Sequence, residues 1–207
     1  MPDSAKPLTA IVSPPSPFAR KVRVTILECG LTDQVGLQHA SNTALKPDPM
    51  LIAANPLGKL PALLRPDGPV ICDSRVITRY LADLSGTDLY PQDRIWDVLT
   101  LEAMADGVME AALTMAYEHR FRPPEMIFHD WVEAQWRKVI RTLVRIDQDW
   151  QAALAAPLDA AQIALGCGLG YLDMRHGARG WRDEAPTLAR WYATFAERDA
   201  MVATRPE

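Results

Sequence analysis

A short strand that runs straight into a helix is the feature that most constrains the fold of this chain. The run from Leu8 to Val12 is apolar and predicts a buried strand, which Pro14 and Pro15 end. Ser16 followed by Pro17 is typical of a helix start, because serine caps the first turn and proline fits the first helical position. The sequence therefore predicts a strand, a tight turn and a hydroxyl group at the beginning of a helix.

The start of this predicted helix is a favourable place for an anion. The helix is expected to run from Ser16 to Cys29, with Val22, Ile26 and Cys29 on one face, and Gly30 closes it. Its first N–H groups have no partner within the helix, and its dipole is positive at this end. A phosphate, a carboxylate or a thiolate would be stabilised there. The alternative is that Ser16 only caps the helix, which is the commoner role of such serines.

Composition and charge exclude several classes of protein. The chain has 207 residues, 48% of them hydrophobic, which suffices for one domain or two small ones, and its formal net charge of -4 argues against nucleic-acid binding. Met1 to Pro7 show no signal-peptide pattern, and no apolar run is long enough to cross a membrane, so we expect a soluble, cytoplasmic protein. The cysteines have neither zinc-site nor disulfide-framework spacing, which fits a reducing compartment; they are Cys29, Cys72 and Cys167.

The first third of the chain mixes strands and helices. An irregular stretch spans residues 42–55, and Asp67-Gly68 between two apolar runs predicts a hairpin. The predicted order is therefore β-α-β, an irregular stretch and then β-β-α. After the first strand and helix, we expect strands at 34–39, 61–65 and 69–71, one helical turn at 50–54 and a helix from Asp73-Ser74 to Leu84.

Beyond residues 86–91 no strand pattern appears. A helix is predicted at 93–120, and a second one follows whose apolar residues recur at steps of four and three until Pro157 ends it. We therefore expect one domain at residues 1–86 and an all-helical domain at residues 92–207. The predicted buried residues of the two helices are Ile95, Leu99, Met104, Val108 and Met115, and Val132, Trp136, Val139, Leu143, Ile146 and Trp150.

A third helix of this part begins with a variant capping box, in which Asp159 is the cap and Gln162 returns a hydrogen bond. The helix is almost wholly apolar as far as Met174, which predicts a position in the middle of its domain. Its glycines at 166, 168 and 170 follow no strand, so they favour close helix packing over a phosphate-binding loop. A last helix is predicted at 186–198, with Leu188, Phe195 and either Trp191 or Tyr192 buried.

Four motifs in this order resemble those of the cytosolic glutathione transferases, and in particular the bacterial serine-type members of the YibF-like kind. They are Ser-Pro-x-x-Arg-Lys-Val at 16–22, Asn-Pro-Leu-Gly-Lys-Leu-Pro-Ala-Leu at 55–63, Asp73-Ser74 and the capped helix at 159–170. The resemblance covers essentially the whole chain. It implies a thioredoxin-like glutathione-binding domain followed by a helical domain, a homodimer and glutathione as co-substrate, with no metal.

The resemblance also assigns roles to single residues. Ser16 would donate a hydrogen bond to the sulfur of glutathione and hold it as a thiolate, and Ser13 is the competing hydroxyl. The bond before Pro61 would be cis and would present the backbone of Leu60 to the cysteinyl part of glutathione. The other expected glutathione contacts are Phe18, Lys59 at the glycyl carboxylate, Asp73 and Ser74 at the γ-glutamyl end, and Asp106 across a subunit boundary.

Each of these residues has a plainer alternative. Pro61 would otherwise begin an edge strand, Asp73-Ser74 would cap a helix, and Lys59 and Asp106 would face solvent. Asp73 is also shorter than the glutamate common in the family. The substrate pocket is expected between the domains, where Pro15 and Phe18 would face residues of the long helix, namely Met109, Leu113 and Tyr117.

The substrate class remains open at this point. His119 and Arg120 would favour an anionic substrate, unless they only pair with the helix dipole or solvent. The expected function is conjugation of glutathione to small hydrophobic electrophiles, as in detoxification. The alternatives are glutathione-dependent reduction, isomerisation or dehalogenation on the same fold, and a non-catalytic interaction protein. No partner among nucleic acids or membranes is expected.

Overall fold

The structure is a computed structural model that describes residues 8–41 and 43–206. Residues 1–7, where no signal peptide was expected, lie outside the described residues. Asn42, where the irregular stretch was expected to begin, lies outside them as well. In the described part, the last strand ends at Leu64, so no strand lies beyond residues 86–91, as expected.

The chain divides into two compact units. The first holds the residues up to Tyr90 together with those from Ala203 onward, and the second is Pro91–Val202. The residues from Ala203 onward therefore belong to the first unit, whereas they were expected in the helical domain. In the first unit, Arg20 Nε donates a hydrogen bond to Thr204 Oγ1 over 3.4 Å, which ties the C-terminal residues to that unit.

The first unit is built on a sheet of order β2-β1-β3. β1 (Leu8–Val12) lies in the middle, parallel to β2 (Val35–His39) and antiparallel to β3 (Ala62–Leu64). A central strand is buried on both faces, which explains why β1 is apolar along most of its length rather than alternating. The predicted strands at 8–12 and 34–39 are thereby confirmed to within a residue.

The predicted hairpin after β3 is wrong in its second arm. Only one pair of residues bridges the two arms, with Leu63 N donating to Ile71 O over 2.9 Å and Ile71 N to Leu63 O over 3.0 Å. Pro69 has no N–H to give to a ladder, and its carbonyl accepts from Arg65 Nε over 2.9 Å. The arm is therefore a single bridge rather than a strand.

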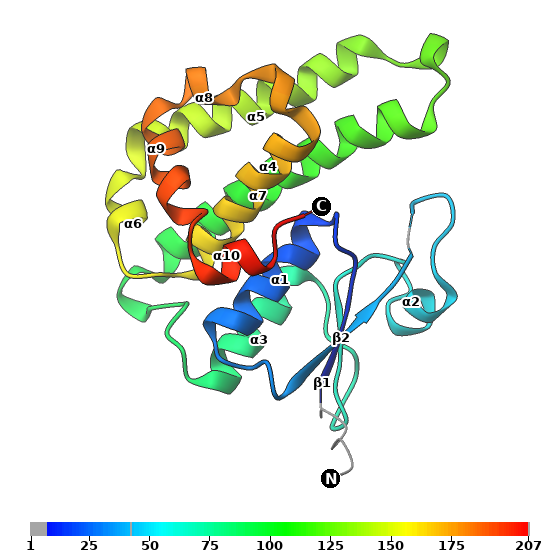
Figure 1. The fold of residues 1–207 in the computed structure, drawn as a ribbon, viewed down its shortest axis with the longest axis vertical. Coiled ribbons are helices and arrows are strands. Elements are labelled where there is room, and N and C mark those ends of the chain that lie inside the picture. The colour runs from blue at the N-terminus through cyan, green and yellow to red at the C-terminus, as the bar shows by residue number, and fades with distance from the viewer. Residues whose placement is uncertain (1–7, 42, 207) are drawn as a thin grey trace. The chain divides into compact units, whose positions relative to one another are not determined.

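Helices cover both faces of this sheet, as Figure 1 shows. One apolar cluster joins alternate residues of β1 to α1 (Pro17–Glu28) and α3 (Ser74–Ser85), and the other joins Ile11 to Leu51 of α2 (Pro49–Ala54). The alternation follows the two-residue period of a strand. The sheet with helices on its two faces confirms the expected thioredoxin-like domain.

The second unit is entirely helical in the described residues. Its centre is α7 (Ala160–His176), which packs against α4 (Ile95–Phe121), while α4 also packs against α5 (His129–Asp149). The remaining helices are η1 (Gln92–Arg94), η2 (Pro124–Met126), α6 (Gln151–Ala155), η3 (Gly177–Arg179), α8 (Trp181–Glu184), α9 (Pro186–Phe195) and α10 (Asp199–Ala203). The last of them belongs to the second unit only as far as Val202.

The predicted buried face of α4 is partly wrong. Val108 and Met115 are buried as expected, but Leu99 is 36% exposed. A single stripe was expected for α4, whereas contact with both α5 and α7 buries a broader face. The stripe on α5 is confirmed more closely, because Val132, Val139, Leu143 and Ile146 are all buried.

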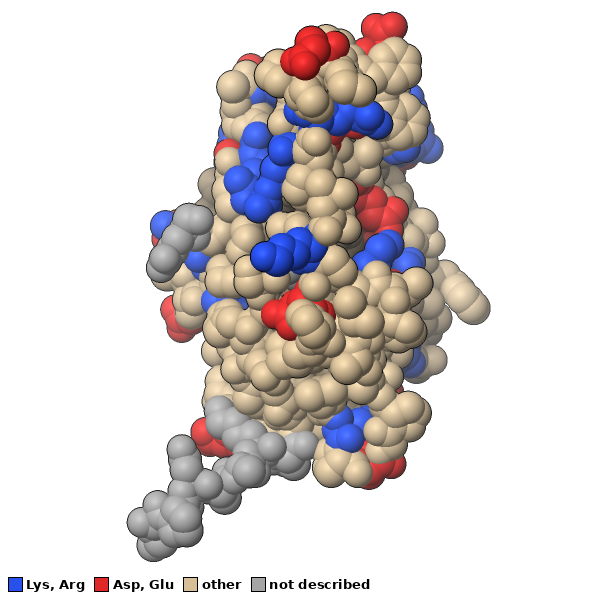
Figure 2. Space-filling model, turned by 90° about the vertical axis from the view of Figure 1, so that its right-hand side faces the viewer, with Lys and Arg blue, Asp and Glu red and all other residues tan. Residues whose placement is uncertain are grey.

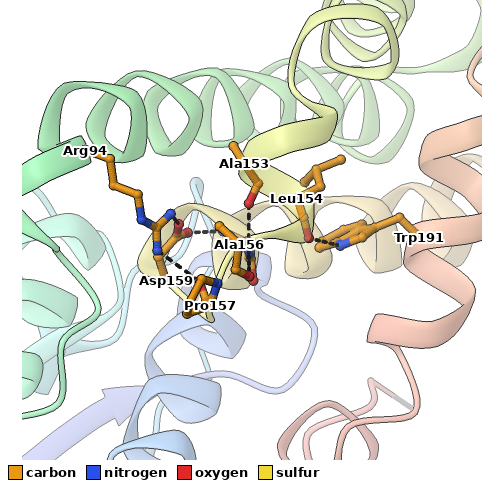
Figure 3. Close-up of polar contacts among 8 residues, drawn as sticks. Arg94, Ala153, Leu154, Ala156, Pro157, Asp159 and Trp191 are labelled. Atoms are coloured by element: carbon orange, nitrogen blue, oxygen red, sulfur yellow. Dashed lines mark hydrogen bonds and ion pairs between the residues drawn. The ribbon is translucent and has the colours of Figure 1, made fainter.

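The second long helix ends earlier than predicted. It stops at Asp149, and the chain bends at Trp150 into α6, well before Pro157. The indole Nε1 of Trp191 donates to the carbonyl of Leu154 in α6 over 3.1 Å, as Figure 3 shows. This contact comes from a helix far along the chain, so a local pattern did not reveal it.

The cap of α7 is confirmed in part. Asp159 Oδ1 accepts from Gln162 N over 3.0 Å, but the side chain of Gln162 does not return to the cap. Gln162 Nε2 instead donates to the carbonyl oxygens of Ala153 and Ala156, at 2.8 and 3.1 Å. The expected reciprocal box is therefore wrong, and Gln162 ties α7 to the end of α6.

The glycines of α7 pack closely, as expected. A Cβ atom added at Gly166 would lie 2.5 Å from the ring of Phe195, and one at Gly168 would lie 3.3 Å from Met109 Cγ. The approach at Gly166 leaves no room for a Cβ atom, and the approach at Gly168 is tighter than an ordinary van der Waals contact. They confirm close helix packing at Gly166 and Gly168.

Candidate active site

Strand register brings three segments of the first unit to one end of its sheet. Ile11 lies opposite Ala62 in the antiparallel pair β1–β3, so the residues that follow β1 and those that precede β3 lie at the same end. Ile71 pairs antiparallel with Leu63, so the chain that leaves Ile71 also leads to this end. The starts of α1 and α3 and the residues before β3 thus gather there, which Figure 1 lets the reader follow.

Ser16 is the N-cap of α1. Its Oγ accepts a hydrogen bond from Ala19 N over 3.2 Å, and its own N–H donates to Ser13 O over 3.1 Å in the turn after β1. A serine hydroxyl has two lone pairs and one hydrogen. Capping uses a lone pair, so the hydrogen is still available for a ligand. The same turn leaves Pro15 exposed and Phe18 half-buried.

Asn55 shapes the loop before β3, a role that our sequence analysis did not assign to it. Its side chain is 3% exposed; Nδ2 donates to Lys59 O over 2.7 Å, and Oδ1 accepts from Leu57 N over 3.1 Å. Gly58 in this loop has a φ of +60°, a conformation that glycine adopts without strain. The sequence did contain a signal for this turn, because an asparagine followed by Pro-Leu-Gly is a strong turn sequence.

The loop leads into a cis peptide bond between Leu60 and Pro61, as predicted. Leu60 is half-buried, and Lys59 is exposed. Among the described residues, the ammonium group of Lys59 has no ion-pair partner, so it is available to an anionic ligand.

Asp73 and Ser74 begin α3. Asp73 caps the helix, with Oδ1 accepting from Arg75 N over 3.0 Å and Oδ2 lying 3.2 Å from Arg75 Nη2. Burial raises the pKa of the Asp73 carboxyl, but the hydrogen bonds and the positive charge of Arg75 outweigh it, so the pKa lies below its ordinary value. Ser74 is 3% exposed, and its carbonyl accepts from Thr78 Oγ1. The predicted cap is therefore present, and its carboxylate is ionised at neutral pH.

The candidate residues of the helical unit lie along α4. Met109 is fully buried beside Gly168, whereas Leu113 and Tyr117 are half-buried. Asp106 is only 4% exposed, so the alternative that it faces solvent is wrong. Its predicted contact with glutathione stays a prediction.

The described residues contain no group of three or more histidine, cysteine or acidic side chains placed to hold a metal ion. No helix among them is long and apolar enough to span a membrane.

Two family models match the chain. The model of the glutathione S-transferase N-terminal domain matches residues 15–84, and that of the C-terminal domain matches residues 130–194. The uncharacterized GST-like protein YibF of Escherichia coli K12 is 29% identical over 196 residues, which cover 92% of this chain and 95% of that protein.

Solved structures agree with this result. A glutathione transferase family member from Pseudomonas fluorescens Pf-5 with bound glutathione is 42% identical, with a TM-score of 0.94 over 97% of this chain and 99% of that chain. A family member from the same bacterium with bound S-(propanoic acid)-glutathione is 40% identical, with a TM-score of 0.89 over 97% of this chain and 100% of that chain. A glutathione S-transferase from Methylobacillus flagellatus KT with bound glutathione is 37% identical, with a TM-score of 0.85 over 97% of this chain and 100% of that chain.

Proposed function

The chain belongs to the glutathione S-transferase family, and on this premise we propose that it activates the thiol of glutathione for attack on small electrophiles. The observation that carries the proposal is the position of Ser16 at the first turn of α1, with its hydroxyl hydrogen still available. The 15–84 segment that matches the N-terminal family model contains every expected glutathione contact except Asp106.

Ser16 would act by stabilising a thiolate. A free thiol has a pKa of about 8.5, so only a few per cent of it is ionised at neutral pH. A hydrogen bond to a charged group contributes about 1.5–3 kcal/mol, which corresponds to a decrease of roughly 1–2 pKa units. The unpaired N–H groups of the α1 start act in the same direction. The sulfur then bonds to the electrophilic carbon while the leaving group departs with its electron pair.

The remaining contacts would hold the tripeptide in an extended form. The Asp73 carboxylate attracts the γ-glutamyl ammonium, and Ser74 at the start of α3 receives the γ-glutamyl carboxylate. The backbone of Leu60 would pair with the cysteinyl part as a neighbouring strand does. Lys59 would neutralise the glycyl carboxylate, and Asn55 would hold the Lys59 backbone in place.

For the second substrate, we propose that Leu113 and Tyr117 of the helical unit contribute to the electrophile pocket. They are half-buried, so their side chains retain surface for a ligand. A related protein holds S-(propanoic acid)-glutathione, so thioether conjugates of this kind are candidate products here as well.

We also propose that the protein is a homodimer. Trp96 in the first turn of α4 is 77% exposed, and a large aromatic side chain of this exposure is typical of an interface. Sedimentation of the wild type should give twice the mass of one chain, and Trp96→Glu should shift it toward the monomer. A monomeric wild type at micromolar concentration would contradict this part of the proposal.

The function is tested by calorimetry with glutathione and by following the thiolate absorbance of bound glutathione as a function of pH. Ser16→Ala should raise the pKa of the bound thiol and slow conjugation, whereas the matched variant Ser13→Ala should change neither. No binding at millimolar glutathione would leave only a scaffold of this fold. An effect of Ser13→Ala without one of Ser16→Ala would reassign the activating hydroxyl.

A further inference from the structure

The C-terminal segment, residues 203–206, belongs to the unit that carries the proposed glutathione site. The chain reaches this segment from the helical unit, which ends at Val202. In Figure 1 the segment, drawn in red, lies next to the start of α1, drawn in blue, and a hydrogen bond from Arg20 to Thr204 joins the two. The end of the chain therefore contacts the helix that Ser16 caps.

One residue of the C-terminal segment is buried. Among the described residues after Met201, only Thr204 falls in this class, with 2% of its surface exposed, whereas Ala203 and Arg205 on either side of it are exposed. A segment held by apolar packing alone would bury an apolar side chain, and threonine is more often exposed. The hydroxyl group of Thr204 is therefore the feature that needs a physical reason.

The partner of this hydroxyl is an arginine that is itself buried. Arg20 Nε donates a hydrogen bond to Thr204 Oγ1 over 3.4 Å. Figure 2 shows Lys and Arg side chains at the surface of the face that it draws, which is the usual place for such cations, whereas Arg20 is only 4% exposed. Burying a guanidinium is costly unless its N–H groups have acceptors. The Thr204 hydroxyl is one of the acceptors that stabilise Arg20 in its buried position.

Arg20 is also bonded directly to the residue that would activate the thiol. Its backbone N–H donates to Ser16 O over 2.9 Å, which is the first hydrogen bond of the α1 ladder. Ser16 Oγ accepts from Ala19 N in the same turn. Because these bonds close a single helical turn, a shift of Arg20 moves the Ser16 cap with it. The position of the Ser16 hydroxyl thus depends on how firmly Arg20 is held.

Apolar packing by itself would not fix this turn. Ala19 and Val22 of α1 lie in the apolar cluster that joins the helix to the sheet. Such packing is non-directional, so it holds the helix against the sheet without setting the direction of the hydroxyl. The hydrogen bond from Ser16 N to Ser13 O constrains the turn from one side, and the contact between Arg20 and Thr204 constrains it from the other.

We propose that Thr204 and Arg20 are positioning residues for the thiolate site, through which the C-terminal segment fixes the first turn of α1 and the direction of the Ser16 hydroxyl. The inference rests on the proposed function and adds to it two residues that lie 184 positions apart in the chain. Neither residue is among the proposed glutathione contacts, so both act through the geometry of Ser16. A hydrogen bond weakens steeply as its angle departs from linearity, so a small rotation of this hydroxyl leaves the bound thiol less ionised.

The test follows the thiolate absorbance of bound glutathione as a function of pH in Thr204→Val, a change that removes the hydroxyl and keeps the branched shape. The pKa of the bound thiol should rise by about half a unit, which leaves about threefold less thiolate at a fixed pH below that pKa. The rate of conjugation at that pH should fall by the same factor. Calorimetry below the pKa of the bound thiol should show an unchanged affinity for glutathione. Thr204→Ser, which keeps the hydroxyl, should restore the wild-type pKa.

Arg20→Lys examines the same contact from its other side, because lysine keeps the positive charge and lacks the Nε donor. This variant should also raise the pKa of the bound thiol. Adding Thr204→Val to it should raise the pKa no further, since both changes remove the same hydrogen bond. Arg205→Gln is the matched control, because Arg205 is exposed on the same segment and its loss should leave the pKa unchanged. Urea unfolding of each variant separates a loss of stability from an effect on the thiol.

The outcomes separate this inference from the proposed function. If Thr204→Val binds glutathione with the wild-type thiol pKa, the C-terminal segment only stabilises the fold; the positioning role is then overturned and the proposed function stands. Additive effects of Thr204→Val and Arg20→Lys would overturn it as well, because the two residues would then act independently. Should Thr204→Val not fold, Arg20→Lys decides by the same criterion. If the wild type does not bind glutathione, or Ser16→Ala leaves the thiol pKa unchanged, the proposed function fails and the positioning role fails with it.

Discussion

Removing the carboxylate of Asp159 should destabilise the helical unit more than any surface change, because this side chain does two things at once. It caps α7 through Gln162 N, and it forms an ion pair with Arg94 while being only 1% exposed. Arg94 is 21% exposed and also donates from Nη2 to Pro157 O over 3.0 Å (Figure 3). The whole arrangement lies within the second unit.

The magnitude follows from these two roles. Loss of a helix cap costs about 1 kcal/mol. Removing one member of a buried ion pair costs roughly 3–5 kcal/mol, and the partial exposure of Arg94 favours the lower end, about 3 kcal/mol. We therefore expect Asp159→Ala to lower the free energy of unfolding by about 4 kcal/mol. Asp159→Asn should lower it by about 3 kcal/mol, because asparagine caps a helix as well as aspartate does.

Urea unfolding of these variants measures the contributions of both the helix cap and the buried ion pair. The matched control is Asp149→Asn, since Asp149 forms an exposed pair with Arg145 and its loss should cost less than about 1 kcal/mol. Equal effects of the alanine and asparagine variants at Asp159 would show that the cap contributes nothing. An effect of Asp159→Ala no larger than that of the control would refute the claim that the buried pair stabilises this unit.

Three further predictions concern packing, the loop before β3 and acid stability. Gly166→Ala should lower the free energy of unfolding by about 1–3 kcal/mol, because its Cβ would overlap the ring of Phe195. Gly107→Ala should raise the free energy of unfolding by about 0.5–1 kcal/mol, because its Cβ would meet nothing within 4 Å. Thermal unfolding distinguishes the two variants. Asn55→Ala should cost about 1–3 kcal/mol and weaken glutathione binding in calorimetry, because the loop loses two hydrogen bonds of a buried side chain. The pKa of Asp73 is depressed, so its contribution to the free energy of unfolding is present above the ordinary pKa of 3.8 and is lost as the pH falls below that value. This contribution should be under about 1 kcal/mol because the side chain is exposed. Urea titrations at pH 2–5 should show that Asp73→Asn removes this loss of stability in acid.

Local sequence was sufficient where a structure depends on neighbouring residues. The Ser16-Pro17 helix start, the Asp159 cap and the strand at 8–12 all appear as predicted, because caps and short apolar runs act within a few residues. The cis bond before Pro61 was also expected, although it came from the resemblance to the family rather than from the residues alone.

The predictions that failed have different causes. The second arm of the hairpin is a single bridge for a local reason, because Pro69 cannot donate and Arg65, four residues before it, takes its carbonyl. Gln162 turned away from the cap because the carbonyls of α6 lie within its reach, a proximity that no spacing along the chain encodes.

By itself, the sequence determined that a hydroxyl stands at the first turn of the first helix, because capping chemistry is local and serine with proline specifies it. Only the tertiary structure decided what surrounds the end of α7. Ala112 and His176 are more than sixty residues apart, and it is the packing of α4 against α7 that brings the carbonyl oxygen of Ala112 within 2.9 Å of His176 Nε2. Such a contact acts through space, so its partners become known only when the chain has folded.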